Sequence, residues 1–168
     1  MRAAPPPRVV IVMGVAGAGK STLAAALAAT LGARFIEGDA YHPECNIAAM
    51  SAGRPLTDDM RQGWLDRLAA EAAGTPGRVV LACSALKRAH RERLRAGIGA
   101  CRFLHLACDP GVAATRIATR QGHFMAPSLL PSQFAALEPP APDEADAVTL
   151  AAALTPGQLL ATALLHVG

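Results

Sequence analysis

Two kinds of hydrophobic pattern alternate along the chain. Residues 9–13 form a continuous, largely β-branched apolar run between a proline and a glycine, which is typical of a strand buried on both faces. Residues 21–31 instead carry leucines at positions 23, 27 and 31, the spacing of one helix face, and Gly32 follows as a stop signal. The chain therefore begins with a buried strand and an amphipathic helix.

The same alternation continues to residue 167. It predicts further strands at 34–37, 78–82, 102–107 and 146–150, and helices at 43–52, 57–74, 86–96, 111–120, 132–137 and 156–167. The polar segment 121–131 contains glycine and proline and is expected to be mobile. Because strands alternate with helices, we expect one domain over 1–168, an α/β/α three-layer sandwich with a parallel five-stranded sheet and a lid at about 121–131.

Composition limits the class of protein. Of 168 residues, 52% are hydrophobic and 17% charged, which excludes a disordered or membrane-embedded chain. The net charge of +3 is too small and dispersed to indicate nucleic-acid binding, but it suits an anionic substrate. The four cysteines form no CxxC pair, zinc pattern or disulfide framework, so we expect a reducing cytoplasm, with Cys83 and Cys108 as buried thiols.

The N-terminus imitates a signal peptide without matching one well. Arg2 precedes the apolar run 9–15 and small residues follow that run, but Pro5, Pro6 and Pro7 interrupt its start. No other segment reaches the length of a membrane span without charge or proline. We therefore expect a soluble protein.

Residues 14–21 carry the most specific motif. Their sequence, GVAGAGKS, matches Gly-x-x-x-x-Gly-Lys-Ser/Thr in full and stands between a predicted strand and a predicted helix. Glycines let the backbone wrap round a phosphate and expose its N–H groups, and the following helix adds its positive end. The motif predicts a P-loop that binds ATP, in which Lys20 reaches the β- and γ-phosphates and the Ser21 hydroxyl binds Mg²⁺.

Missing motifs narrow the class of P-loop protein. A GTPase needs an Asn-Lys-x-Asp motif, yet Asn46 is the only asparagine in the chain. A motor or transporter ATPase usually ends a strand with a magnesium-binding acid, and the predicted strand 78–82 lacks one. A kinase that acts on a small metabolite remains.

Two acids follow the second predicted strand. Glu37 and Asp39 are expected beside the P-loop at the carboxyl edge of the sheet, where open α/β sheets bind ligands. Asp39 can orient an accepting hydroxyl and take its proton, and Glu37 can hold a magnesium-bound water. Position alone leaves a plain Gly-Asp turn as an equal alternative.

Five further sequence blocks resemble the gluconokinase family, in the family's order. They are Gly38-Asp39 with His42-Pro43, Asn46 and Met50; Gly53-x-Pro55-Leu56-x-Asp58-Asp59-x-Arg61 with Trp64-Leu65; Cys83-Ser84-Ala85-Leu86-Lys87 with Arg91; Arg120-x-Gly122-His123-Phe124; and Ser132-Gln133-Phe134 with Leu137-Glu138-Pro139. The resemblance extends from residue 9 to about residue 150. It implies a fold similar to shikimate and adenylate kinases, ATP- and magnesium-dependent phosphorylation of D-gluconate at its 6-hydroxyl, and a homodimer.

The residues and the resemblance together give a candidate site. The expected catalytic residues are Lys20, Asp39 and Arg120. ATP is expected to contact Gly14, Val15, Ala16, Gly17, Ala18, Gly19, Lys20, Ser21, Thr22, Arg116 and Arg120. Gluconate is expected to contact Asp39, His42, Asn46, Met50, Arg61, Ser84, Lys87, Arg91, His123 and Gln133. Magnesium is expected at Ser21 and, through water, at Glu37, where family members more often have aspartate.

Plainer interpretations stay open for some of these residues. Arg61 can pair with Asp58, three residues earlier on the helix, instead of clamping a substrate carboxylate. Arg116 and Arg120 can match the dipole of a helix C-terminus instead of neutralising the transferred phosphoryl group.

Two alternatives for the whole chain also stay open. One is a kinase for another hydroxy acid such as shikimate, and the other is a nucleotide-binding regulatory module without turnover. On the predicted helix 86–96, Arg88 and Arg95 are expected on a solvated face.

Overall fold

The computed structural model describes residues 5–168, so Arg2 of the N-terminal segment lies outside them. Within this range the strands are β1 (Val9–Met13), β2 (Arg34–Glu37), β3 (Val79–Ala82), β4 (Cys101–Ala107) and β5 (Ala147–Ala151). The α-helices are α1 (Lys20–Leu31), α2 (Glu44–Ser51), α3 (Asp58–Gly74), α4 (Arg88–Ile98), α5 (Pro110–Thr119), α6 (Leu130–Ala136) and α7 (Pro156–Val167). Two short 3-10 helices are η1 (Gly38–Tyr41) and η2 (Pro127–Leu129). No helix in the described range has the length and apolar character needed to cross a bilayer.

The five strands form one parallel sheet in the order β2-β3-β1-β4-β5. β1 lies at its centre, and Val9 pairs with Val79 of β3 on one side and with Cys101 of β4 on the other. Every residue of β1 is buried, as expected for a parallel strand with helices on both faces. The parallel five-stranded sheet predicted from the sequence is confirmed.

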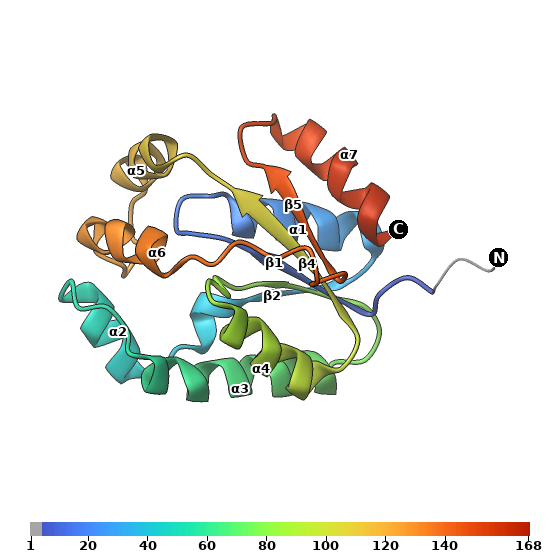
Figure 1. The fold of residues 1–168 in the computed structure, drawn as a ribbon, viewed down its shortest axis with the longest axis horizontal. Helices are drawn as coiled ribbons and strands as arrows, with labels where there is room; N and C mark the ends of the chain where they lie inside the picture. The colour runs from blue at the N-terminus through green and yellow to red at the C-terminus, as the bar shows by residue number, and fades with distance from the viewer. Residues whose placement is uncertain (1–4) are drawn as a thin grey trace.

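Helices cover both faces of this sheet (Figure 1). On one face, Trp64 of α3 and Leu94 of α4 pack with Phe103 of β4. On the other face, Leu27 of α1 and Leu159 of α7 belong to a second apolar core. This arrangement is the three-layer α/β/α sandwich predicted from the sequence.

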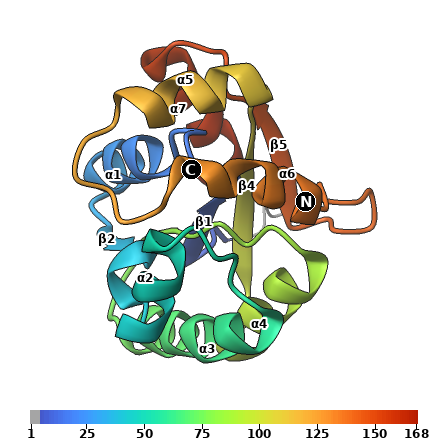
Figure 2. The same ribbon diagram turned by 90° about the vertical axis from the view of Figure 1, so that its left-hand side faces the viewer.

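The loops that follow β1, β2, β3 and β4 leave the sheet at its carboxyl edge. α2, α5 and α6 gather at this end of the molecule, which faces the viewer in Figure 2. Open α/β sheets bind ligands in the crevice at this edge. The fold therefore places the P-loop and the end of β2 where the sequence predicts a site.

Residues 121–131, called the lid from here on, are packed more closely than their polar composition predicts. The segment includes η2 and the start of α6, and it buries Met125, Leu129 and Leu130. The Ala126 amide donates to the Met50 carbonyl at 3.2 Å, and the Ser51 hydroxyl donates to the Phe124 carbonyl at 2.9 Å. The lid is therefore docked on α2.

Candidate active site

A cavity of about 250 Å³ opens at the carboxyl edge of the sheet. The P-loop, η1, α3, α5 and the lid all contribute to its wall. It is lined by many residues of the candidate site: Ala16, Gly17, Gly19, Lys20, Ser21, Thr22, Asp39, His42, Met50, Arg61, Ser84, Arg116, Arg120, His123 and Gln133. The structure thus brings the expected phosphate cradle and the expected sugar-binding residues into one space.

The P-loop has backbone angles that its glycines permit. Gly14, Gly17 and Gly19 have φ angles of 148°, 80° and 96°, which L side chains rarely adopt. At Gly17, an added Cβ would lie only 2.7 Å from the Ala113 carbonyl oxygen of α5. Glycine is therefore required at position 17 by packing as well as by backbone conformation.

Lys20 is the first residue of α1, and its side chain turns back into the P-loop. Its Nζ donates to the Val15 carbonyl at 2.9 Å. Burial lowers the pKa of Lys20, and the nearby Asp39 carboxylate opposes this shift. The ammonium group therefore lies inside the loop that is expected to hold phosphate.

Close backbone packing fixes the position of Asp39. The preceding residue, Gly38, starts η1, and a Cβ there would collide with the Ala82 carbonyl oxygen at the end of β3. Trp64 Nε1 donates to the Gly38 carbonyl at 2.8 Å. Glycine is required at position 38 because β2 and β3 come together there, and Asp39 follows immediately at the cavity wall.

Two histidines flank the Asp39 carboxylate. His123 Nε2 of the lid contacts Oδ2 at 3.1 Å, and His42 Nε2 lies 3.9 Å from Oδ1. Burial alone would raise the pKa of Asp39, yet the hydrogen bond with His123 and the charge of Lys20 hold that pKa below its ordinary value. Asp39 is therefore a carboxylate at neutral pH.

His42 is part of an aromatic wall. Its ring stacks on Trp64 with centroids 4.0 Å apart and meets Phe124 of the lid edge-on at 6.0 Å. Burial lowers the pKa of His42 to about 4, although the Asp39 carboxylate opposes the shift. The imidazole is therefore neutral at physiological pH.

Arg61 of α3 contributes a cation to the cavity wall. Its side chain is not paired with Asp58, since both Asp58 oxygens lie 3.0 Å from Lys87 Nζ instead. Burial lowers the pKa of Arg61, and the charge of Asp58 opposes that shift. The plainer interpretation of Arg61 as a partner of Asp58 is therefore not what the structure shows.

Arg116 and Arg120 approach the P-loop from the C-terminal end of α5. Arg116 Nη1 donates to the Gly17 and Ala18 carbonyls at 3.2 and 3.3 Å. Arg120 lies where α5 ends and lines the same cavity. Both cations suit the helix dipole there as well as the phosphate site, so the two interpretations are compatible.

Two segments outside the P-loop are fastened to it. Gln133 Oε1 of α6 accepts from the Ala16 amide at 2.7 Å. The Gly14 amide donates to the Ser84 carbonyl, after β3, at 3.2 Å. The loops on both sides of the cavity are thus held at fixed positions relative to the P-loop.

Other residues of the candidate site do not line this cavity. Those outside its lining include Gly14, Val15, Ala18 and Glu37. Asn46 is buried behind His42, where its Nδ2 contacts His42 Nδ1 at 3.3 Å and the Met60 carbonyl at 3.1 Å. The substrate contact expected for Asn46 is therefore replaced by a supporting contact to His42.

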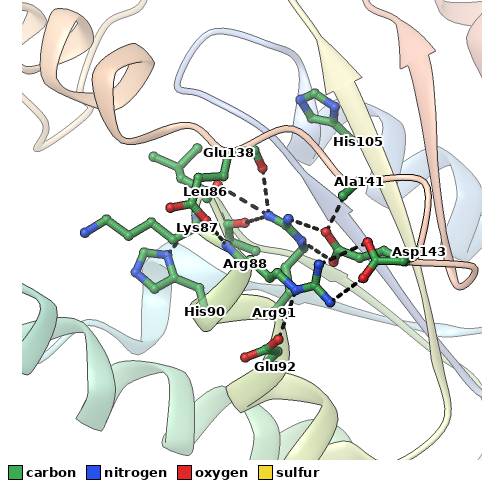
Figure 3. A network of polar contacts seen from close by, with 12 residues as sticks. Leu86, Lys87, Arg88, His90, Arg91, Glu92, His105, Glu138, Ala141 and Asp143 are labelled. Carbon is green, nitrogen blue, oxygen red and sulfur yellow. Dashed lines mark hydrogen bonds and ion pairs between the residues drawn. The ribbon is translucent and has the colours of Figure 1, made fainter.

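Lys87 lies outside the lining of the cavity. The residue adopts an extended conformation just before α4, and its Nζ forms the ion pair with Asp58 at the start of α3. Figure 3 shows the side chain extending away from Arg91. The substrate contact expected for Lys87 does not fit this orientation.

Arg91 is completely buried and also lies outside the cavity lining. Its Nε and Nη2 donate to the Glu144 carboxylate at 2.8 and 2.7 Å, and its Nη1 donates to the Ala85 carbonyl. The same Nη1 donates to the Leu86 carbonyl (Figure 3). The substrate role expected for Arg91 is therefore corrected to a structural one. The expectation of a solvated face is also wrong for Arg95, which pairs with Glu144 and Asp146.

The buried pair leads to a prediction about stability. Glu144→Gln leaves Arg91 buried without a countercharge, so we expect the free energy of unfolding to fall by about 3–5 kcal/mol in urea titrations. The matched control is Asp143→Asn, which removes an exposed pair with Arg88 and is expected to cost at most about 1 kcal/mol. Equal losses in the two variants would contradict this assignment.

The same pair predicts a dependence of stability on pH. The hydrogen bond from Arg91 holds the pKa of Glu144 far below its ordinary value. A carboxyl with a depressed pKa contributes stability above its ordinary pKa, and that contribution is lost as the pH falls below about 4.5. Urea titrations from pH 7 to pH 3 should therefore show a steeper loss in the wild-type protein than in Glu144→Gln.

The cavity wall also contains residues that were not assigned to the site from the sequence. These are Pro55, Leu56, Trp64, Phe124, Met125, Leu129 and Ser132. Trp64 is also a buried core residue of α3. A buried indole N–H needs a hydrogen-bond partner, which here is the Gly38 carbonyl before Asp39. This requirement could have indicated from the sequence that Trp64 also contributes to the site.

A second cavity, of about 310 Å³, adjoins the first. The two share Gly19, Thr22 and Arg116, and the rest of the second lining is apolar: Ala18, Leu23, Ala26, Ala152, Leu154, Pro156 and Leu159. It therefore offers an apolar slot directly beyond the phosphate cradle, between α1 and the loop that joins β5 to α7.

Comparison with known proteins agrees with this geometry. The AAA domain family matches residues 9–137. A gluconokinase from Gluconobacter oxydans is 49% identical over 142 residues, which cover 82% of this chain and 79% of that protein. The crystal structure of a gluconokinase from Sinorhizobium meliloti superposes with a TM-score of 0.86 at 42% identity, covering 96% of this chain and 91% of that one.

An unliganded sugar kinase from Janibacter is also similar, with a TM-score of 0.89 and 44% identity over 95% of this chain and 94% of that chain. The family match over residues 9–137 spans the P-loop, Asp39 and the lid, the segments that form the cavity. The chain therefore belongs to the gluconokinase family of P-loop kinases.

Proposed function

We propose that this protein transfers the γ-phosphoryl group of ATP to the 6-hydroxyl of D-gluconate, giving 6-phospho-D-gluconate and ADP. One observation carries the proposal: Lys20 of the P-loop, the Asp39 carboxylate and the Arg61 guanidinium line the same cavity. A kinase for a linear sugar acid needs these three groups, because its substrate has a hydroxyl at one end and a carboxylate at the other. Family membership supports the same reaction.

The nucleotide occupies both cavities in this proposal. Its phosphates lie on the P-loop, and its adenine lies in the apolar slot beside Leu154 and Leu159. Positive φ angles at Gly17 and Gly19 support the phosphate end, since a cradle of backbone amides needs them. Arg116, which lines both cavities, lies between the two ends of the nucleotide.

Magnesium is part of the proposal, held by the Ser21 hydroxyl and, through water, by Glu37. Ser21 lines the cavity together with Lys20, and hydroxyl and carboxylate oxygens are the ligands that Mg²⁺ prefers. The ion supplies charge neutralisation at the β- and γ-phosphates when it is bound.

Asp39 is the general base of the proposed reaction. It accepts the 6-hydroxyl proton while the sugar oxygen bonds to the γ-phosphorus and the bond to the leaving oxygen of ADP breaks. Lys20 and Arg120 balance the negative charge that spreads over the phosphoryl oxygens. The docked lid covers the cavity and excludes water that would otherwise hydrolyse ATP.

Arg61 sets the substrate class in this proposal. A forked guanidinium can bind a carboxylate through two hydrogen bonds. A neutral sugar would leave this half-buried cation unpaired, which is costly. Ser84, Met50 and Gln133 form the remaining wall along which the sugar chain lies.

The test is ADP release with D-gluconate, glucose and shikimate at equal concentration. We expect gluconate to be turned over far faster than the other two. Arg61→Lys should raise KM for gluconate about 10- to 100-fold with little change for ATP, because an ammonium group cannot form the forked pair. Arg67→Lys, an exposed change on the same helix, is the control and should behave like the wild type.

The outcomes separate the proposal from its alternatives. Equal rates for gluconate and glucose, or a preference for shikimate, would show that the substrate assignment is wrong and that only the kinase class stands. ATP binding without turnover of any sugar acid would show that the protein is a nucleotide-binding module and not a kinase. A cytoplasmic location and a homodimer complete the proposal, and the four free thiols support the first of these.

A further inference from the structure

Two imidazoles flank the Asp39 carboxylate, and the other ring nitrogen of each is also engaged. His123 reaches Oδ2 from the lid, and His42 faces Oδ1 from the end of η1. A neutral imidazole carries its single proton on one nitrogen only. The partner of each Nδ1 therefore determines whether the Nε2 that faces Asp39 is a donor.

The backbone of the lid determines which ring nitrogen of His123 carries the proton. The Met125 amide, which can only donate, contacts His123 Nδ1 at 3.2 Å. Nδ1 must then be the acceptor, so Nε2 carries the proton and donates it to Asp39. The docking of Ala126 and Phe124 on α2 holds this stretch of lid in place.

The buried Asn46 side chain determines which ring nitrogen of His42 carries the proton. The Met60 carbonyl can only accept, and it lies 3.1 Å from Asn46 Nδ2, which identifies that atom as the amide nitrogen. The second hydrogen of this nitrogen faces His42 Nδ1 at 3.3 Å. His42 is then also an Nε2–H tautomer, directed at Asp39 from 3.9 Å.

We infer that His123 is a positioning residue for the catalytic base, fixed as an Nε2–H donor by the Met125 amide, that Asn46 sets the neighbouring His42 in the same tautomer, and that Asp39 is fully oriented only while the lid is docked. This inference rests on the proposed role of Asp39. It gives the two histidines a different role from the sugar contact expected from the sequence. It also links lid closure to the readiness of the base.

The other charged groups near Asp39 are consistent with this role. Lys20 and Arg120 line the same cavity as Asp39, and the charge of Lys20 lowers the pKa of that carboxyl. Both residues belong to segments outside the lid, Lys20 to α1 and Arg120 to the end of α5. His123 is the group that the lid itself adds, so its removal isolates the contribution of closure.

The first experiment is ¹⁵N NMR of the imidazoles in the wild-type protein at pH 7. His42→Gln and His123→Gln assign the two rings. Both rings are expected as neutral Nε2–H tautomers, with His123 Nε2–H shifted by its hydrogen bond. A charged ring, or an Nδ1–H tautomer at either position, would overturn the inference without reference to activity.

The second experiment compares His123→Leu with His123→Gln. Leucine removes the donor, so kcat should fall about 10- to 100-fold, the cost of losing one hydrogen bond to a charged group. KM for gluconate should change by less than about 3-fold, because the inference assigns the ring to Asp39 rather than to the sugar. Glutamine keeps a donor near the Nε2 position and should recover most of kcat.

The control is His166→Gln on α7, far from the cavity, which should leave kcat unchanged. Thermal melting shows whether each variant is folded. A rise in KM with kcat preserved in His123→Leu would overturn the inference and return His123 to the sugar. Failure of the wild-type protein to phosphorylate gluconate would instead overturn the proposed function, while the tautomers would stand.

Discussion

Asp39→Asn is expected to lower kcat for gluconate phosphorylation by about 10²- to 10⁴-fold while ATP affinity stays nearly constant. The substitution keeps the shape of the side chain and removes the acceptor for the 6-hydroxyl proton. Asparagine can also still accept from His123, so the lid contact is preserved. Steady-state kinetics and ATP titration measure the two quantities separately.

A matched control for this variant is Asp59→Asn, an exposed acid in the first turn of α3. It should leave kcat unchanged. A collapse of ATP binding in Asp39→Asn would contradict the assignment, because it would show that Asp39 serves the nucleotide or the fold rather than the transfer step.

Lys20→Ala is expected to lower turnover by at least about 10²- to 10³-fold. The variant loses the cation that would face the transferred phosphoryl group, at a point where burial makes each charge count for more. Lys87→Ala is the control, since Lys87 forms a partly exposed ion pair outside the cavity. A folded Lys20→Ala protein with near wild-type turnover would rule out the P-loop assignment.

The fold was predictable because its signals are local. The run 9–13 is buried on both faces, and Gly32 ends α1 in the left-handed conformation that favours glycine. The start of α4 was placed two residues early, at 86 instead of Arg88. Ala85 has a φ of 42°, a left-handed conformation that cannot continue into a right-handed helix. No residue type in that stretch predicts this conformation.

The site was predictable where a motif is contiguous and less so where it depends on distant partners. The P-loop and the acid after β2 are read from a few neighbouring residues. Arg91 and Glu144 are 53 residues apart. The hydrophobic periodicity of α4 cannot show that the ion-pair partner of Arg91 lies on another segment. Composition likewise described the lid as polar, whereas its few apolar residues decide how it packs.

The burial of Cys83 has a consequence for chemical labelling. This thiol directly precedes Ser84 of the cavity wall, yet burial raises its pKa to about 12, so almost none of it is the reactive thiolate at neutral pH. Cys45, in contrast, is exposed on α2, the helix against which the lid docks. A maleimide fluorophore should therefore attach much faster at Cys45 than at Cys83 in the native protein, and it would then lie on the helix that carries the docking contacts of the lid.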